Sequence, residues 1–358
     1  MHQLPNAPRI SLPRWGIFLF LVSCLFVIPG CGVFGTHKKI QVPKLLSPLA
    51  EADKTQLLRE INRLASIKSI HGRVDILFED NSFADVGLAD KYKQADGTVT
   101  LQRPGAVYLV IQVPFIAKDI AQMTSDGQHF RVAVLEGDEK YRRFVKGTNS
   151  AVYEKMDLNG TASASSKDGK RKTTKEKEAV SALSNLRPQH LTEALIIAPA
   201  VVPPEAGVTY SRSEFYQDEI DNSRQPNKSG RVIRGYYLLE ELVQTGDGEG
   251  RLRRRFWFDR VGTIRLARLQ TFDEHGLLVA DVSYLDEKPV GDGGRTMPTR
   301  VEITRPHDRY KLSIAYQNPA EVVIDKEYRP EAFVLENKWQ LPEVDLDAER
   351  NKKVTANH

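Results

Sequence analysis

A hydrophobic pattern with a period of two residues recurs along most of this 358-residue chain and constrains its fold more than any other feature. Val74, Ile76 and Phe78 alternate with Asp75, Leu77 and Glu79, which is typical of a β-strand with one buried face. Similar segments follow, separated by turns rich in glycine, proline and aspartate. They predict about eleven to thirteen strands. We therefore expect a mainly β protein built on one large antiparallel sheet.

Two segments have helical patterns instead. Asp53 and Gln56 have the spacing of a capping box, and apolar residues on one helical face continue to about Ile67. A second helix is expected within the range 183–197, with Pro188 in a first helical turn. Each helix has an apolar face, so we expect both to pack on the sheet.

The N-terminal segment predicts a cleaved signal peptide over residues 1–30. Its apolar run from Trp15 to Ile28 is shorter than the roughly 20 residues of a membrane-spanning helix. The residues around Cys31 resemble the lipobox of bacterial lipoproteins, which would make Cys31 the acylated first residue of the mature chain. Cys24 is the alternative site of acylation, but cleavage there would leave an apolar core of only about seven residues. An uncleaved anchor helix is the alternative to cleavage.

A glycine, Gly32, follows the cysteine that we expect to be acylated. In the lipoproteins that this segment resembles, an aspartate at that position retains the protein in the inner membrane. The resemblance therefore implies a lipid anchor in the outer membrane, on its periplasmic face. Several acyl chains hold a protein firmly without a further anchor. Residues 31–50, which include Pro43 and Pro48, are expected to form a tether.

The mature chain is close to electrically neutral. The full sequence has 51 basic and 47 acidic residues, and the leader contributes Arg9 and Arg14, which leaves 49 against 47. This balance argues against a nucleic-acid-binding protein. Both cysteines lie in the leader or directly after it, so we expect no disulfide in the folded part.

No group of residues predicts catalysis. The sequence has no G-x-S-x-G, no H-E-x-x-H and no phosphate-binding loop, and its histidines occur singly. Carboxylates are numerous, but nothing marks two of them as an acid and base pair. We therefore expect a non-enzymatic protein with no metal site and no cofactor.

Three segments differ from the rest in composition. Residues 159–178 are small, polar and charged, which predicts a disordered insertion. Residues 336–358 are expected to be a polar tail. The segment from Arg251 to Phe258 interleaves basic and aromatic residues, which can bind nucleic acid or lipid phosphates. The alternative is a half-buried strand with an arginine-rich outer face, and alternation along a strand favours it.

Several motifs, in their order along the chain, resemble the LolA/LolB family of periplasmic lipoprotein carriers and receptors. They lie at residues 66–73, 95–99, 101–105, 125–130 and 268–273, followed by Gly276 and Phe333. The resemblance covers about residues 51–335. It implies an unclosed antiparallel β-barrel whose concave, apolar face is lidded by helices and holds the acyl chains of a lipoprotein or lipid. The insertion and a longer second half depart from the family pattern.

The resemblance also implies a membrane-contacting loop. In the receptor type, a protruding loop engages the bilayer through an exposed apolar residue, and by correspondence this residue is Phe115, with Ile116 beside it. The alternative is that Phe115 caps the core at a strand end. We expect a monomer that binds an acylated lipoprotein or lipid and contacts the membrane through its anchor, with no nucleic-acid partner. The alternative function is a structural or regulatory envelope module that binds a protein partner.

Overall fold

A computed structural model describes residues 42–80, 93–136, 139, 142–151, 153, 187–221, 230–246 and 248–356 of the chain. The chain divides into two units, Met1–Pro43 and Lys44–His358. The signal peptide, Cys24, Cys31 and the insertion expected at 159–178 all lie outside the described residues. The following description concerns the second unit.

One 16-stranded sheet forms the body of this unit, with the strand order β1-β9-β10-β11-β12-β13-β14-β2-β3-β4-β5-β6-β7-β16. Strand β8 pairs with β9, and β15 pairs with β2. The strands are β1 (Lys44–Leu45), β2 (Ser69–Asp80), β3 (Lys93–Gln102), β4 (Ala106–Gln112), β5 (Asp119–Asp126), β6 (His129–Val134), β7 (Arg143–Thr148), β8 (Val208–Ile220), β9 (Arg231–Gln244), β10 (Gly250–Asp259), β11 (Arg265–Phe272), β12 (Leu278–Val290), β13 (Arg295–Arg305), β14 (Tyr310–Tyr316), β15 (Val323–Ile324) and β16 (Glu343–Asp345).

The sheet is mostly antiparallel and does not close. Only the pairs β1·β9 and β16·β7 are parallel. The outermost strands, β8 and β16, each pair with a single neighbour and not with each other, within the described part of the chain. The expectation of a mainly β protein with one large unclosed antiparallel sheet is confirmed.

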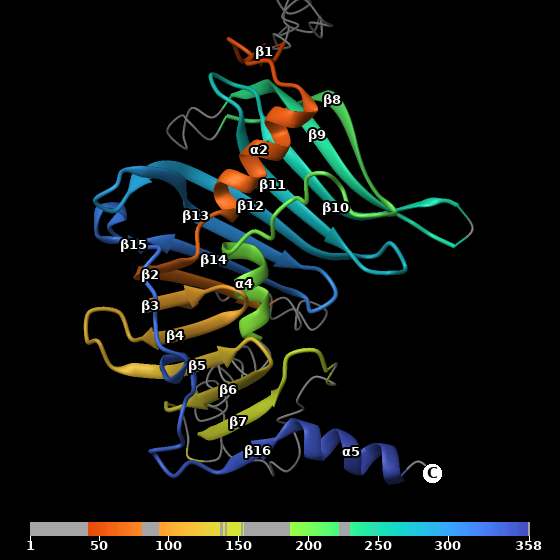
Figure 1. The fold of residues 1–358 in the computed structure, drawn as a ribbon. Helices are drawn as coiled ribbons and strands as arrows, with labels where there is room; N and C mark the ends of the chain where they lie inside the picture. Colours follow the sequence, from red (N-terminus) through yellow and green to blue (C-terminus); the bar gives the residue numbers. More distant parts are fainter. Residues whose placement is uncertain are drawn as a thin grey trace, which may run out of the picture. The chain divides into compact units, whose positions relative to one another are not determined.

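Three α-helices occur in the described residues: α2 (Lys54–Ala65), α4 (Pro188–Leu195) and α5 (Leu346–Ala356). Short 3₁₀ helices, η4 (Pro319–Glu321) and η5 (Pro330–Phe333), lie near the end of the sheet-forming sequence. Figure 1 shows α2 and α4 on the same face of the sheet. This arrangement agrees with the expectation that both helices pack on the sheet.

Helix α2 begins where its capping box predicts. The Asp53 side chain accepts a hydrogen bond from the Gln56 backbone N–H, and the Gln56 side chain accepts one from the Asp53 backbone N–H, each at 2.7 Å. This reciprocal pair satisfies two amide groups that a helix start otherwise leaves free. Leu57, Ile61 and Leu64 lie on the buried face of the helix. The sequence pattern and the packing thus agree along all of α2.

The helix-covered face of the sheet is apolar. Phe256 and Phe258 of β10 and Tyr237 and Leu239 of β9 are completely buried there. They belong to the same continuous core as the buried leucines of α2 and α4. Because strand side chains alternate between the two faces, Trp257 between the two phenylalanines points to the opposite, more polar face.

The two ends of the unit are more ordered than the sequence suggests. Residues 44–50, expected to belong to the tether, join the sheet through β1 and through a bridge between Leu49 and Val261. The expected polar tail contains β16 and α5, and Leu341 is buried against Phe144. These pairings are two or three residues long, which is too short to produce a recognisable period in the sequence.

Candidate functional site

Two helices and one extended segment cover the apolar face of the sheet. Leu57 and Ile61 of α2 and Leu191 and Ala194 of α4 are buried in the same cluster as the sheet residues beneath them. Residues 196–200, which we call the strap, continue from the end of α4. We use the word lid for α2 with the two residues that follow it (66–67), α4 and the strap together.

A small apolar gap lies between the lid and the sheet. Leu64, Leu195 and Ile197 line it from the lid, and Tyr284, Val301 and Tyr316 line it from the sheet. Its volume is about 20 Å³. A space of this size can hold about one water molecule, so it does not hold an acyl chain. The described conformation is therefore closed, and an apolar ligand can enter only if the lid moves.

Arg103 joins two parts of the lid to the sheet. It directly follows β3, and its guanidinium donates one hydrogen bond to the Ile67 carbonyl beyond α2 and one to the Ile197 carbonyl of the strap, each at 2.8 Å. Burial lowers the pKa of this guanidinium from its ordinary value, but arginine keeps its charge in proteins. Hydrogen bonds from a charged donor are stronger than neutral ones. The Arg103 side chain therefore acts as a clasp: it binds the lid at two points, beyond α2 and in the strap.

Further polar contacts hold the strap. The Asn62 amide of α2 donates to the Ala200 carbonyl and accepts from the Ala200 N–H, at 2.9 Å each. Arg254 of β10 donates to the carbonyls of Ala198 and Pro199, at 2.9 and 3.1 Å. Arg254 also pairs with the fully buried Glu241. Polar contacts to α2 and β10 therefore hold the strap, together with the burial of Ile196, Ile197 and Ala200 in the core.

Two tyrosines and a histidine hold α4 to the sheet. The Tyr284 hydroxyl donates to the Ala194 carbonyl at 3.0 Å. The His190 ring nitrogen Nδ1 lies 2.6 Å from the Tyr310 hydroxyl. Burial, with the nearby Arg305 and Arg187, lowers the pKa of His190 well below its ordinary value. His190 is therefore neutral at pH 7 and can accept the Tyr310 hydrogen bond.

The turn between β4 and β5 projects two apolar side chains into solvent. Phe115 is 103% exposed and Ile116 is 72% exposed. Phe115 also has a φ of 66°, in the left-handed region that a bulky residue rarely adopts. An exposed side chain does not cap the core, so the alternative interpretation of Phe115 does not fit the structure. A strained backbone that displays an apolar residue favours a functional role.

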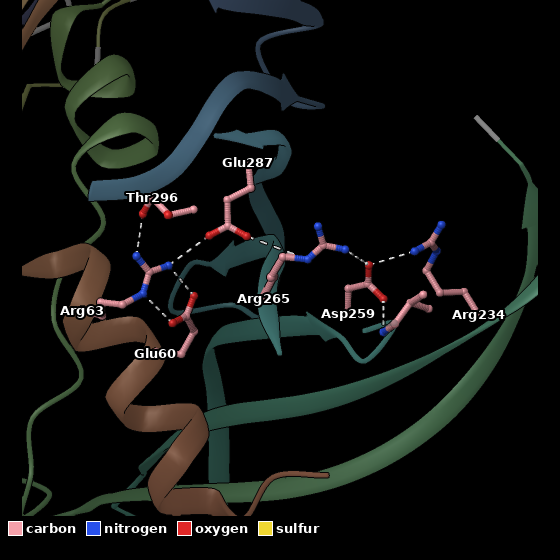
Figure 2. A network of polar contacts seen from close by, with 8 residues as sticks. Glu60, Arg63, Arg234, Asp259, Arg265, Glu287 and Thr296 are labelled. Carbon is pink, nitrogen blue, oxygen red and sulfur yellow. Dashed lines mark hydrogen bonds and ion pairs between the residues drawn. The ribbon is translucent and has the colours of Figure 1, made fainter. Parts of the chain in front are cut away.

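Residues of strands β8 to β13 line a groove of about 500 Å³. Figure 2 shows a row of alternating charges along it. Glu287 lies 3.1 Å from Arg63 of α2 and 3.8 Å from Arg265, and Asp259 lies 3.0 Å from Arg265 and 2.8 Å from Arg234. Each arginine of the row already has a carboxylate partner. The row therefore ties α2 to the sheet and presents no unpaired charge to a ligand.

The arginine-rich segment of β10 is also paired internally. Arg253 and Arg254 both contact Glu241, and Arg255 contacts Glu240 at 2.7 Å. A register shift between Leu252 and Arg254 places Arg254 on the helix-covered side. The half-buried strand is thus the interpretation that the structure supports, since each of these arginines has a carboxylate partner within the sheet.

Candidate metal sites and membrane-spanning helices are both absent from the part of the chain that the structure describes. In the described residues, no group of three or more His, Cys, Asp or Glu side chains is placed to hold a metal ion. None of the helices in this part of the chain combines the length and the apolar character needed to cross a membrane. Nothing in the sequence selects Asn62 or Tyr316, and Arg103 appeared there only within the motif at residues 101–105.

Comparisons with known proteins give distant structural similarities. No family model and no curated protein matches the sequence. A DUF1329 family protein from Desulfovibrio piger has a TM-score of 0.40 at 11% identity, over 78% of this chain and 95% of that one. A LolA superfamily protein from Nitrosomonas europaea has 0.38 at 11% identity, over 79% and 99%. A domain provisionally named an outer membrane lipoprotein-sorting protein, from Vibrio parahaemolyticus, has 0.38 at 9%, over 77% and 95%.

Proposed function

We propose that this chain is a non-enzymatic, membrane-attached protein that binds the acyl chains of a lipoprotein or lipid between its lid and its sheet. The observation that carries the proposal is the construction of the lid: an apolar layer closed by a few polar contacts, with Arg103 at 2.8 Å from both edges. Such a lid can open without unfolding the sheet, because the sheet's own hydrogen bonds are not involved.

The energies of lid opening and acyl binding are of similar size. Each intramolecular hydrogen bond contributes about 1 kcal/mol net to stability, and the polar contacts that join the lid to the sheet are few: two from Arg103, two from Arg254, those of Tyr284 and Tyr310 with α4, and that of Arg63 with Glu287. Each buried methylene of an acyl chain contributes about 0.8 kcal/mol. An acyl chain that occupies the apolar face can therefore offset the loss of the closing contacts. The ligand is released when the acyl chain leaves the apolar face and the polar contacts of the lid form again.

The site of action follows from two further features. Cys31 as a lipid anchor would keep the protein on the periplasmic face of the outer membrane, where acylated ligands are delivered. The exposed Phe115 and Ile116 would enter the bilayer and bring the binding site to the membrane surface. Both features are more typical of a membrane-attached receptor, which delivers a ligand to the membrane, than of a freely diffusing carrier.

The alternative, a module that binds a protein partner, has less support. Such a module would use the strand from Arg251 to Trp257 or the basic insertion at 159–178. Arg253, Arg254 and Arg255 have carboxylate partners, and Arg251 donates to the Glu274 carbonyl. The insertion lies outside the described residues. We therefore favour the lipid-binding function.

A binding experiment tests the proposal. The full chain, delipidated in mild detergent, is titrated with a fatty acid that carries an environment-sensitive fluorophore. We expect saturable binding that an unlabelled diacyl lipid reverses. A correctly folded protein, as judged by circular dichroism, that binds neither the probe nor the lipid would exclude this function.

A further inference from the structure

Tyr284, Tyr310 and Tyr316 lie on the helix-covered face of the sheet, beneath the lid, and they differ in the partners of their hydroxyl groups. Tyr284 donates its hydroxyl hydrogen bond to Ala194, and Tyr310 is bonded to His190. The Tyr316 hydroxyl is buried and has no hydrogen-bond partner among the described residues. The first two hydroxyls therefore hold α4, whereas the third performs no function in the closed conformation.

Tyr316 lies at the gap where an apolar ligand would enter. It lines the gap together with Leu64 and Ile197 of the lid. Its ring is seated against Gly72 of β2, where an added Cβ would lie 3.0 Å from the Tyr316 Cδ1 atom. A side chain at position 72 would therefore displace the ring. The glycine at position 72 therefore leaves space for the Tyr316 ring.

An unpaired buried hydroxyl is unfavourable, and water does not easily correct it here. Leaving a buried donor unsatisfied costs more than an ordinary hydrogen bond contributes. A water molecule buried in a protein usually makes two to four hydrogen bonds. With the side chains that line the gap a water would make two hydrogen bonds at most, one accepted from Tyr316 and one donated to Tyr284, whose own proton goes to Ala194; this is the lowest number usual for a buried water. A ligand atom that needs only one donor fits this site better than water does.

We propose that the Tyr316 hydroxyl donates a hydrogen bond to the ester carbonyl of a bound acyl chain, so that the site selects fatty acyl esters over plain hydrocarbon chains. This inference rests on the proposed lipid-binding function and specifies its ligand. A carbonyl oxygen accepts one hydrogen bond readily. The methylene tail of the acyl chain is apolar, like the leucine and isoleucine side chains that line the gap. Phospholipids and the diacylglyceryl group of lipoproteins both contain this ester.

A competition experiment tests the selection. The delipidated full chain is offered an equal mixture of diacyl and dialkyl-ether phosphatidylethanolamine of the same chain length, and native mass spectrometry measures the bound ratio. The wild type should prefer the diacyl lipid by about threefold to tenfold, as one hydrogen bond allows. Tyr316→Phe should bind both lipids equally. A second arm replaces the diacyl lipid by a diacylated lipopeptide, which identifies the natural source of the ester.

The possible failures are distinguishable. A wild type that binds neither lipid excludes the proposed function itself. A wild type that binds both equally, or a Tyr316→Phe variant that keeps the preference, excludes the role of Tyr316 and leaves lipid binding intact.

Stability gives an independent readout. Lipid-free Tyr316→Phe should melt at the same temperature as the wild type or higher, because no hydrogen bond is lost. Tyr284→Phe, the matched control, loses its bond to Ala194 and should melt lower. A fall for Tyr316→Phe as large as that for Tyr284→Phe would show that the hydroxyl already has a partner, and would overturn the inference.

Discussion

Asn62 and Ala200 are joined by two reciprocal hydrogen bonds of 2.9 Å, although they lie 138 residues apart in the sequence. Asn62 belongs to α2 and Ala200 ends the strap, so this pair makes the two parts of the lid one unit. Arg103 then connects that unit to the sheet at two carbonyls. Movement of the lid is therefore expected to be concerted, because neither part can leave without breaking contacts to the other.

Removing the Arg103 guanidinium should loosen the lid. Arg103→Met keeps much of the aliphatic length but leaves the Ile67 and Ile197 carbonyls without their donor. We expect a loss of about 2–3 kcal/mol in the free energy of unfolding, since these bonds come from a charged group. We also expect faster binding of a fluorescent acyl probe in stopped-flow measurements. The control is Arg73→Met, which lies at an exposed position of β2. If the two variants bind the probe at the same rate, Arg103 does not hold the lid closed.

Phe115 should matter for membrane contact and not for stability. Phe115→Glu replaces a side chain that is 103% exposed, so the free energy of unfolding should change by no more than about 0.5 kcal/mol. Transfer of a phenylalanine into an apolar phase contributes about 1.5–3 kcal/mol. Association of the non-acylated chain with liposomes, measured by co-sedimentation, should therefore fall at least about tenfold.

Phe115→Gly separates the two properties of this residue. Glycine adopts a φ of 66° without strain, so this variant should be more stable than the wild type by up to about 1 kcal/mol. It should nevertheless bind liposomes as poorly as Phe115→Glu. If Phe115→Gly binds liposomes like the wild type, Phe115 does not contact the membrane.

The features that are local in sequence were predictable. The capping box of α2 and the alternation of the long strands each depend on neighbours within a few residues, and both are observed. The Arg103 clasp joins residues 94 positions apart, and the unpaired Tyr316 hydroxyl depends on what surrounds it in space. The same limit explains the C-terminal end, where β16 forms because β7 offers a free edge, not because its own three residues have a strand pattern.

Glu287 links α2 to the sheet at a net cost of charge burial. Its carboxylate lies between Arg63 of α2 and Arg265 of β11 (Figure 2), and burial raises its pKa from the ordinary value despite both arginines. In Glu287→Gln, Arg63 keeps Glu60 and Arg265 keeps Asp259, so we expect the free energy of unfolding at pH 7 to stay within about 1 kcal/mol of the wild type or to rise. Chemical denaturation measures this change, with Glu302→Gln, whose carboxylate pairs with Lys311, as the control. A loss of more than about 2 kcal/mol for Glu287→Gln alone would show that the ionised carboxylate stabilises the fold.

Acid should destabilise the folded state through His190. Burial, with Arg305 and Arg187 nearby, lowers the pKa of His190 well below its ordinary value, so the folded protein keeps the ring neutral as the pH falls. The unfolded chain takes up a proton below about pH 6.5, and this uptake favours unfolding by up to about 1.4 kcal/mol for each pH unit below that value. The raised pKa of Glu193 on the same helix acts in the opposite direction, so the effect of His190 must be isolated by substitution.

His190→Gln makes that comparison, because glutamine can still accept the Tyr310 hydrogen bond but cannot be protonated. Thermal unfolding from pH 4.5 to 7.5 should show a smaller fall in melting temperature on acidification for His190→Gln than for the wild type. His275→Gln, which replaces an exposed histidine, serves as the control. If His190→Gln and the wild type have the same pH dependence, the neutral histidine beneath α4 does not couple acid to the lid.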